Sequence, residues 1–284
     1  MHDIERKPTK PVLKWAGGKR QLIDELKKSM PPKYKNYIEP FIGGGAFLFE
    51  LQPENAIIND YNEELTNLYL VIKNKLSELI PLLLEYKNSH CKDFFYQIRA
   101  LDRTEDFVNI SDVEKAARTL YLNRTCYNGL FRVNRKGYFN TPIGRYKNPQ
   151  ILDDSNLRAV QEYFNSNNIE ILTGDFEQAA LKAKKGDFVY FDPPYYPLTV
   201  TSSFTDYTKN GFCELDHIRL KDLCDTLDKR GVFFMQSNSD CDFIHNLYSE
   251  YHIKSLTVNR SINSCKNKRK NCSEVLITNY TLEQ

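Results

Sequence analysis

The chain has 284 residues, of which 41% are hydrophobic and 27% charged, and its formal net charge at pH 7 is +2. These proportions are ordinary for a soluble globular protein that is long enough for one substantial core and a smaller appended domain. The net charge is too small to argue by itself for a nucleic-acid ligand. No run approaches the ~18 consecutive apolar residues of a membrane span.

The seven cysteines are scattered, odd in number and without CxxC spacing. Free thiols in a reducing compartment are therefore favoured over a disulfide framework or a zinc site, and we expect no bound metal. The first ten residues, MHDIERKPTK, are charged and carry no apolar run, so they do not form a secretory signal. We expect a cytoplasmic location.

The first predicted elements follow an α/β pattern. Residues 38–41 are predicted to form a strand that leads into a glycine turn at residues 43–45. A helix from residue 46 and a short strand at residues 56–60 come next. This alternation of strand, turn, helix and strand is typical of a sheet covered by helices.

The chain then changes character. Apolar residues at helical spacing, such as Leu65 and Leu68, predict helices over residues 62–125. A turn-rich stretch follows at residues 123–149, and its segment 132–140 resembles a basic β-hairpin that closes on a glycine turn. This part is therefore predicted to be helical and hairpin-like.

After about residue 168 the α/β pattern returns. We predict one doubly wound, Rossmann-like α/β sheet, interrupted by a helical and β-hairpin insertion. The sheet is assigned to residues 1–61 and 156–284, and the insertion to residues 62–155. The later strands are predicted at residues 169–172, 187–191, 232–237 and 274–278.

The glycine turn is a candidate nucleoside site. Gly43 and Gly45 follow a strand and open a helix, so the backbone can approach a ligand at the carboxyl end of the strand. The turn is not GxGxxG and lacks the Lys-Ser/Thr of a P-loop. Asp60 ends the next strand, where doubly wound folds place an acceptor for ribose hydroxyls. Taken alone, the pattern fits an ordinary tight turn with a capping Asp equally well.

The tetrapeptide Asp192-Pro193-Pro194-Tyr195 carries the sharpest chemical signal. It follows an apolar strand, and its two prolines fix φ and remove N–H donors. Such a turn presents a carboxylate, free carbonyl oxygens and an aromatic ring together. This set suits an exocyclic amine whose hydrogens are accepted while the ring stacks on a flipped base. The alternative is a structural turn with a helix-capping Asp.

A third cluster lies near the N-terminus, where Trp15 is followed by Gly17, Gly18 and Lys19. The functional interpretation is a lid in which Trp15 packs on a cofactor and Lys19 meets a carboxylate. The alternative is a core Trp beside a solvated basic turn.

Basic residues also interleave with aromatic and amide residues in the turn-rich middle, with almost no acids. That composition suits phosphate contact, major-groove reading by Arg, and base stacking, whereas the alternative is a solvated basic loop. A second basic stretch at residues 260–270 is a candidate phosphate clamp or an ordinary exposed loop.

The motifs occur in the order KWAGGK at residues 14–19, FxGGGA at 41–46, a long signature at 121–147, and DPPY at 192–195. In this order and over nearly the whole chain, the sequence resembles the Dam-type adenine methyltransferases, which methylate adenine in GATC. The resemblance implies a methyltransferase sheet, with the insertion as the target-recognition part.

The resemblance also implies S-adenosylmethionine as the cofactor. Asp60 would take its ribose hydroxyls, and Asp175 and Phe176 its adenine end. The implied cofactor site comprises Trp15, Lys19, Glu39, Phe41, Gly43, Gly45, Asp60, Asp175, Phe176 and Asp192.

Double-stranded DNA is the implied substrate. Arg132 resembles the family's guanine-reading arginine, Lys14 would reach another guanine, and Tyr127 and Asn128 would intrude beside the displaced base. The implied DNA contacts are Lys14, Arg124, Tyr127, Asn128, Leu130, Arg132, Asn134, Pro142, Arg145 and Tyr146.

In the implied reaction, Asp192 and the Pro193 carbonyl accept hydrogen bonds from the target N6, Pro194 stiffens the turn, and Tyr195 stacks on the adenine.

A monomer is expected, with a cognate restriction endonuclease as a candidate functional partner. One alternative is an enzyme of the same fold that acts on cytosine N4 or RNA. Another is a non-catalytic DNA-binding protein, although DPPY and the glycine turn are intact. A dehydrogenase lacks support, since no GxGxxG is present.

Overall fold

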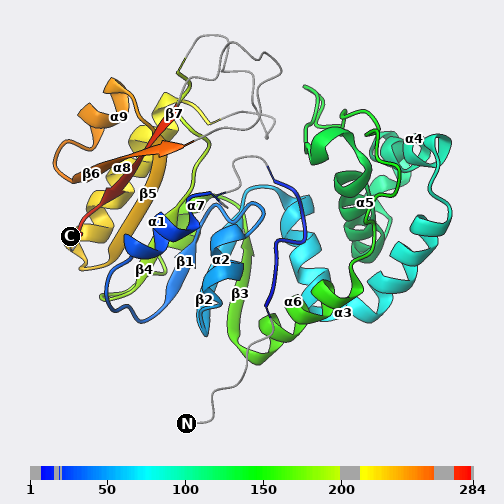
Figure 1. The fold of residues 1–284 in the computed structure, drawn as a ribbon, viewed down its shortest axis with the longest axis horizontal. Coiled ribbons are helices and arrows are strands. Elements are labelled where there is room, and N and C mark those ends of the chain that lie inside the picture. Colours follow the sequence, from blue (N-terminus) through cyan, green and yellow to red (C-terminus); the bar gives the residue numbers. More distant parts are fainter. Residues whose placement is uncertain (1–7, 16–18, 20, 199–211, 259–271, 283–284) are drawn as a thin grey trace.

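The computed structural model describes residues 8–15, 19, 21–198, 212–258 and 272–282. Within these residues, seven strands form one sheet in the order β3-β2-β1-β4-β5-β7-β6 (Figure 1). Strands β1 to β5 are parallel, whereas β7 lies antiparallel between β5 and β6. The strands are β1 (Tyr37–Glu39), β2 (Asn55–Asp60), β3 (Asn168–Thr173), β4 (Phe188–Phe191), β5 (Phe233–Ser239), β6 (His252–Val258) and β7 (Cys272–Thr278).

Helices cover both faces of this sheet. Successive strand residues point to opposite faces, and each face has its own hydrophobic cluster. Tyr37 and Tyr190 belong to one cluster, and their neighbours Ile38 and Val189 to the other. The predicted doubly wound α/β fold is therefore confirmed. The first face is covered by α1 (Ile23–Lys28), α2 (Ala46–Leu51), α3 (Glu63–Asn88) and α6 (Asp154–Ser166), and the second by α7 (Phe176–Ala180), α8 (Glu214–Lys229) and α9 (Asp242–Leu247).

The six predicted strands are all present, with bounds that differ by a few residues. Strand β6 was not predicted from the sequence. It pairs with β7 along its length, and its apolar residues Ile253 and Leu256 are separated by Lys254 and Ser255. This short segment shows no clear alternation of apolar and polar residues, so the sequence alone does not predict a strand. Pairing with β7 gives the segment its extended conformation.

The chain between β2 and β3 builds a helical lobe beside the sheet (Figure 1). One hydrophobic cluster runs from the sheet through α3 into this lobe, so the two parts share a core. The assignment of residues 62–155 to a separate unit stays a prediction. No helix in the described ranges is long and apolar enough to cross a membrane. Besides α3, the lobe contains α4 (Lys92–Ala100), α5 (Asp112–Thr125) and the short 3-10 helices η1 (Leu101–Arg103), η2 (Glu105–Val108) and η3 (Tyr127–Gly129).

The predicted hairpin-like turn follows η3. Val133 pairs antiparallel with Phe139, and the Asn134 side chain accepts hydrogen bonds from two backbone N–H groups of the turn, those of Lys136 and Tyr138. Gly137 has φ +86°, a conformation that glycine adopts without strain. The basic segment is thus a tight hairpin-like loop with a defined shape.

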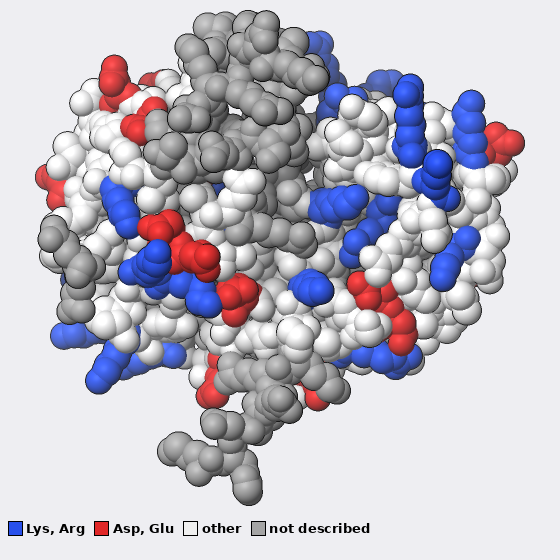
Figure 2. Space-filling model, viewed as in Figure 1, with Lys and Arg blue, Asp and Glu red and all other residues white. Residues whose placement is uncertain are grey.

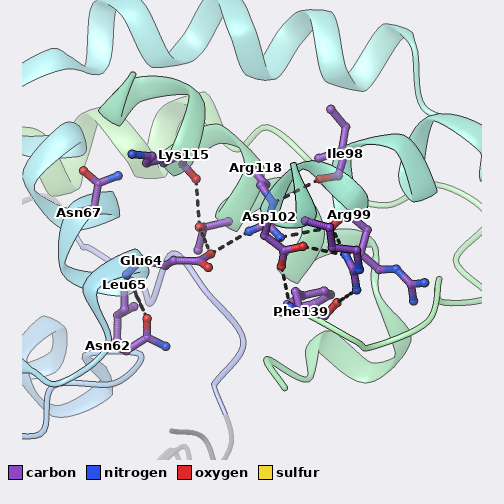
Figure 3. Close-up of polar contacts among 12 residues, drawn as sticks. Asn62, Glu64, Leu65, Asn67, Ile98, Arg99, Asp102, Lys115, Arg118 and Phe139 are labelled. Carbon is purple, nitrogen blue, oxygen red and sulfur yellow. Dashed lines mark hydrogen bonds and ion pairs between the residues drawn. The ribbon is translucent and has the colours of Figure 1, made fainter. Parts of the chain in front are cut away.

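A buried arginine holds this hairpin to the helices (Figure 3). The Arg118 side chain is fully buried, and its guanidinium pairs with Glu64 at 3.0 Å and with Asp102 at 2.6 Å. The same Asp102 carboxylate accepts the backbone N–H of Phe139 at 2.6 Å, while Arg103 donates to the Phe139 carbonyl at 2.7 Å. The hairpin is therefore fixed through its backbone, which leaves its outward side chains available for a ligand.

Replacing Arg118 tests the strength of this connection. Arg118→Met should lower the free energy of unfolding by about 3 kcal/mol, because Glu64 and Asp102 lose a buried cation. This loss is at the low end of the range for breaking a buried ion pair, because Arg103 still pairs with Asp102 at 2.7 Å. Urea denaturation measures the change. Arg158→Met is the matched control, since its ion pair with Asp154 is exposed, and it should cost under about 0.5 kcal/mol. Equal losses in the two variants would contradict the role of the Arg118 network.

Candidate active site

The candidate site lies at the carboxyl ends of the parallel strands. The chain runs from β1 outward to β2 and β3 on one side, and from β4 outward to β5 on the other. In open α/β sheets, ligands bind outside the carboxyl ends of the strands at such a switch point. Glu39 ends β1, Asp60 ends β2, and Asp192 directly follows β4. The fold therefore brings together carboxyl groups that are far apart in the sequence.

Asp60 organises the glycine turn after β1. One of its carboxylate oxygens accepts the Gly43 N–H and the other accepts the Asn62 N–H, each at 2.9 Å. Burial raises the pKa of Asp60 to about 6, and these backbone hydrogen bonds work against the rise. The Tyr69 hydroxyl donates to the Gly43 carbonyl at 2.8 Å. The turn is thus held from both sides, and Asp60 keeps unused lone pairs for a further donor.

Trp15 covers this turn. A Cβ atom placed on Gly43 would lie 2.8 Å from Trp15 Cδ1, and one on Gly44 would lie 3.0 Å from Trp15 Cβ. The indole also packs against Phe131, with ring centroids 5.3 Å apart. The Trp side chain therefore connects the glycine turn with the lobe, and only glycine leaves room for it.

Three aromatic rings form an apolar patch next to the turn. Phe41 stacks on Phe176 with centroids 5.2 Å apart, and Phe212 meets Phe41 edge-on at 5.8 Å. Asp175 caps α7 by accepting the Glu177 N–H at 3.0 Å, and it pairs with Arg219 at 3.0 Å. Stacked aromatics beside a carboxylate suit the flat, hydrogen-bonding ring of a nucleobase.

The DPPY turn meets Lys19 beside this patch. The Lys19 ammonium lies 3.0 Å from Asp192 and 3.5 Å from Glu274, and its side chain is 6% exposed. Burial raises the pKa of Asp192, whereas the Lys19 charge acts to lower it. The Tyr195 hydroxyl donates to Glu274 at 2.6 Å and is also hydrogen-bonded to Lys19. Lys19 thus meets two carboxylates of the protein itself.

The DPPY turn is rigidly attached to β5. The Tyr196 N–H donates to Asn238 at 3.1 Å, and the Ser239 hydroxyl donates to the Tyr196 carbonyl at 2.7 Å. Pro193 is buried, while Pro194 is exposed. Since prolines also fix φ, the orientation of Asp192 and Tyr195 is set by the backbone.

Glu39 occupies a different environment. It is 3% exposed, accepts the Tyr37 hydroxyl at 2.8 Å, and has a pKa that burial raises well above the usual range. The Glu39 side chain is therefore buried inside the protein, next to Tyr37, at the carboxyl end of β1.

The predicted DNA-contacting residues divide into two groups. Lys14, whose ammonium lies 4.6 Å from the Tyr146 ring centroid, is exposed. Arg124 instead donates to the Val12 carbonyl at 2.6 Å, and Asn134 shapes the hairpin turn, so both have evident structural tasks. The other predicted contacts that are exposed are Tyr127, Asn128, Leu130, Arg132, Pro142 and Arg145.

Figure 2 shows the charge on the face seen in Figure 1. Lys and Arg side chains gather on the helical lobe at the right, with few acidic side chains among them. Such a distribution suits a polyanion, although the net charge of the whole chain is only +2. The predicted phosphate clamp at residues 260–270 and the Gly17-Gly18 turn lie outside the described residues. No group of three potential metal ligands occurs among the residues that the structure describes.

The family model of D12 class N6 adenine-specific DNA methyltransferases matches residues 15–262. The chain belongs to this family. It is 45% identical over 271 residues to the Type II methyltransferase M1.LlaDCHI of Lactococcus lactis subsp. cremoris, with 95% of each chain covered. It is 44% identical to the Type II methyltransferase M.MjaIII of Methanocaldococcus jannaschii, covering 95% of this chain and 99% of the relative. It is 32% identical to the DNA adenine methylase of Escherichia coli K12, with 95% of each covered.

Among solved structures, the precorrin 8w decarboxylase of Methanobacterium thermoautotrophicum aligns with 96% of both chains. Its TM-score is 0.39 and its sequence identity 11%, values too low to inform the function.

Membership of the D12 class confirms the resemblance to Dam-type enzymes and the prediction of an adenine-specific DNA methyltransferase. The roles of individual residues stay predictions. Sequence reasoning missed Glu274, Phe212 and Arg219, which the structure places against predicted site residues. A lone acid that opens the apolar run Val275-Leu276-Ile277 is the one signal that could have identified Glu274.

Gly43→Ala tests the contact between Trp15 and the glycine turn. Gly43 has φ +48° and its added Cβ would meet the indole, so the variant should lose about 1–2 kcal/mol of stability and displace Trp15. Because the chain has a single Trp, its fluorescence emission reports that displacement. Gly137→Ala is the control: it has φ +86° with nothing within 4 Å, so it should be strained yet leave the emission unchanged. A comparable spectral change in both variants would rule out a specific contact.

Proposed function

We propose that the protein transfers the methyl group of S-adenosylmethionine to N6 of adenine in duplex DNA, within GATC. The observation that carries the proposal is the meeting of the DPPY turn, the glycine turn and Asp60 at one edge of the sheet. Family membership supports the reaction class.

The residues at the edge fit such a donor. Asp60 accepts ribose hydroxyls on the lone pairs that Gly43 and Asn62 leave unused. Phe41, which is partly exposed and stacks on the buried Phe176, provides an apolar surface for the adenine end, with Asp175 nearby as an acceptor for an exocyclic amine. Gly43 and Gly45 leave room for the Trp15 and Phe49 side chains, which pack against the turn and hold the backbone that would face the ligand.

S-adenosylmethionine, held by the residues named above, would supply an electrophilic methyl group on a sulfonium; the N–C bond to N6 would form as the C–S bond breaks with its electrons on sulfur, and N6 would lose one proton. Asp192 and the Pro193 carbonyl accept the two N6 hydrogens, which directs the lone pair away from them and toward the methyl group. Asp192 then receives the departing proton and releases it to solvent. Tyr195 stacks on the flipped base, so the protein contributes orientation and charge placement.

The lobe supplies the specificity. Arg132 is exposed on the hairpin, and its Nε donates to Asn140 at 2.9 Å, which restricts the orientation of the guanidinium. An arginine fixed in this way suits bidentate reading of a guanine edge. The two relatives at 45% and 44% identity are named Type II methyltransferases, and this favours a protective role beside a cognate restriction endonuclease.

Asp192→Ala tests the reaction. Transfer should fall by about 10³-fold or more, because the principal acceptor for N6 is lost, while S-adenosylmethionine binding stays measurable by calorimetry. Asp106→Ala, at an exposed aspartate in η2, is the control and should keep wild-type turnover. Turnover retained in Asp192→Ala would contradict the role of Asp192 as the acceptor for the target N6. Nucleoside analysis of the product distinguishes N6-methyladenine from methylation at cytosine N4, and a parallel reaction on RNA tests that substrate.

The recognition sequence is tested by digesting methylated DNA with nucleases that differ in their tolerance of methylated GATC. The sensitive nuclease should be blocked and the tolerant one should still cut. Arg132→Ala should reduce discrimination at one guanine by about 10- to 100-fold. Arg135→Ala, an exposed neighbour on the same hairpin, should weaken cognate and altered sites alike. Unchanged cutting would remove the GATC assignment and leave the reaction class untouched.

A further inference from the structure

Glu274 reaches the DPPY turn because of the direction of its strand. β7 runs antiparallel to β5, so the start of β7 lies at the carboxyl edge of the parallel strands. Glu274 is the third residue of β7 and is paired in register with Ser239, the last residue of β5. A parallel strand in this position would have placed Glu274 at the opposite edge.

The Glu274 carboxylate is buried against Tyr195 and Lys19. The residue is 6% exposed, accepts the Tyr195 hydroxyl at 2.6 Å, and lies 3.5 Å from the Lys19 ammonium. Burial raises the pKa of Tyr195 well above its usual range, so the phenol keeps the proton that it donates. Neutral Tyr and charged Lys are thus both oriented toward one carboxylate.

We propose that Glu274 is a positioning residue for methyl transfer. It holds the Tyr195 ring through a hydrogen bond, and it competes with Asp192 for the ion pair with Lys19. This inference rests on the proposed function of the DPPY turn. The Lys19 ammonium lies 4.2 Å from the centroid of the Tyr195 ring, at the hydroxyl end of the ring to which it is also hydrogen-bonded. Both ring faces are thus left to a flipped base, and the hydrogen bond to Glu274 sets the direction in which the ring points.

The division of charge matters for Asp192. Lys19 pairs with Asp192 at 3.0 Å, and Glu274 draws on the same ammonium from 3.5 Å. Within the described part of the chain, the other titratable groups near Asp192 are Glu39 at the end of β1, Tyr190 on β4 and Tyr195. The negative charge of Glu274 acts to raise the pKa of Asp192, so Asp192 is a stronger proton acceptor than it would be with Lys19 to itself.

A double-mutant cycle with Tyr195→Phe tests the contact. Glu274→Ala should lower the single-turnover rate about tenfold in the wild-type background, with little change in S-adenosylmethionine affinity, because a charge-assisted hydrogen bond is lost. In the Tyr195→Phe background the same change should cost less than about threefold, since the hydroxyl is already absent. Equal losses in both backgrounds would overturn the proposed contact.

Glu274→Gln tests the charge. The amide oxygen still accepts from Tyr195, so the maximal rate should stay within about threefold of wild type. Activity requires ionised Asp192, and removing a neighbouring negative charge lowers the pKa of Asp192, so the acid limb of the rate profile should move to lower pH. If the acid limb does not move, the proposal that the Glu274 charge raises the pKa of Asp192 is overturned. Glu250→Gln is the control, because Glu250 pairs with Lys221 at 3.4 Å away from the site and should leave the profile unchanged.

Wild-type product analysis separates this inference from the proposed function. If the wild type forms no N6-methyladenine, the proposed function fails and Glu274 has no such role. If the wild type methylates adenine but the cycle is additive and the acid limb stays in place, only the role of Glu274 fails. Urea denaturation of Glu274→Gln shows whether a rate loss reflects unfolding.

Discussion

A single cation shared by two carboxylates holds three segments together at the carboxyl edge of the sheet. Lys19 comes from the N-terminal segment, Asp192 from the turn after β4, and Glu274 from β7, so three remote parts of the chain meet at one ammonium group. Two carboxylates this close in a buried place would repel each other without Lys19. The Tyr195 hydroxyl completes the cluster. The orientation of the DPPY turn and its acceptor strength both depend on this arrangement.

The second constraint is the continuity between sheet and lobe. One hydrophobic cluster passes from the sheet through α3 into the lobe, and Arg118 then connects α3 and α5 to the hairpin through Glu64 and Asp102. Trp15 adds a contact between the glycine turn and Phe131 of the lobe. The surface proposed to read DNA is thereby held at a fixed position relative to the carboxyl edge of the sheet. Such a position suits an enzyme that must read one base and modify another.

Burial gives the site its chemical character. The pKa values of Asp60 and Asp192 are both raised by desolvation, but different partners oppose the rise: backbone N–H groups for Asp60 and the Lys19 ammonium for Asp192. Backbone donors suit the ribose-binding task proposed for Asp60. A lysine that is itself shared suits the proton-accepting task proposed for Asp192.

The sequence by itself determined six of the seven described strands, the glycine turn, DPPY and the basic hairpin, because each depends on local periodicity, on the special φ preferences of Gly and Pro, or on a contiguous motif. Tertiary structure alone decided β6, whose short pattern becomes a strand by pairing with β7. It also showed that Arg124 and Asn134 serve the protein's own backbone, whereas Arg132 is exposed. Lys19 was expected to meet a carboxylate, but that it meets Asp192 follows from the place of β4 in the sheet, and that it meets Glu274 follows from the antiparallel direction of β7. Strand direction and register are long-range properties, and no local pattern encodes them.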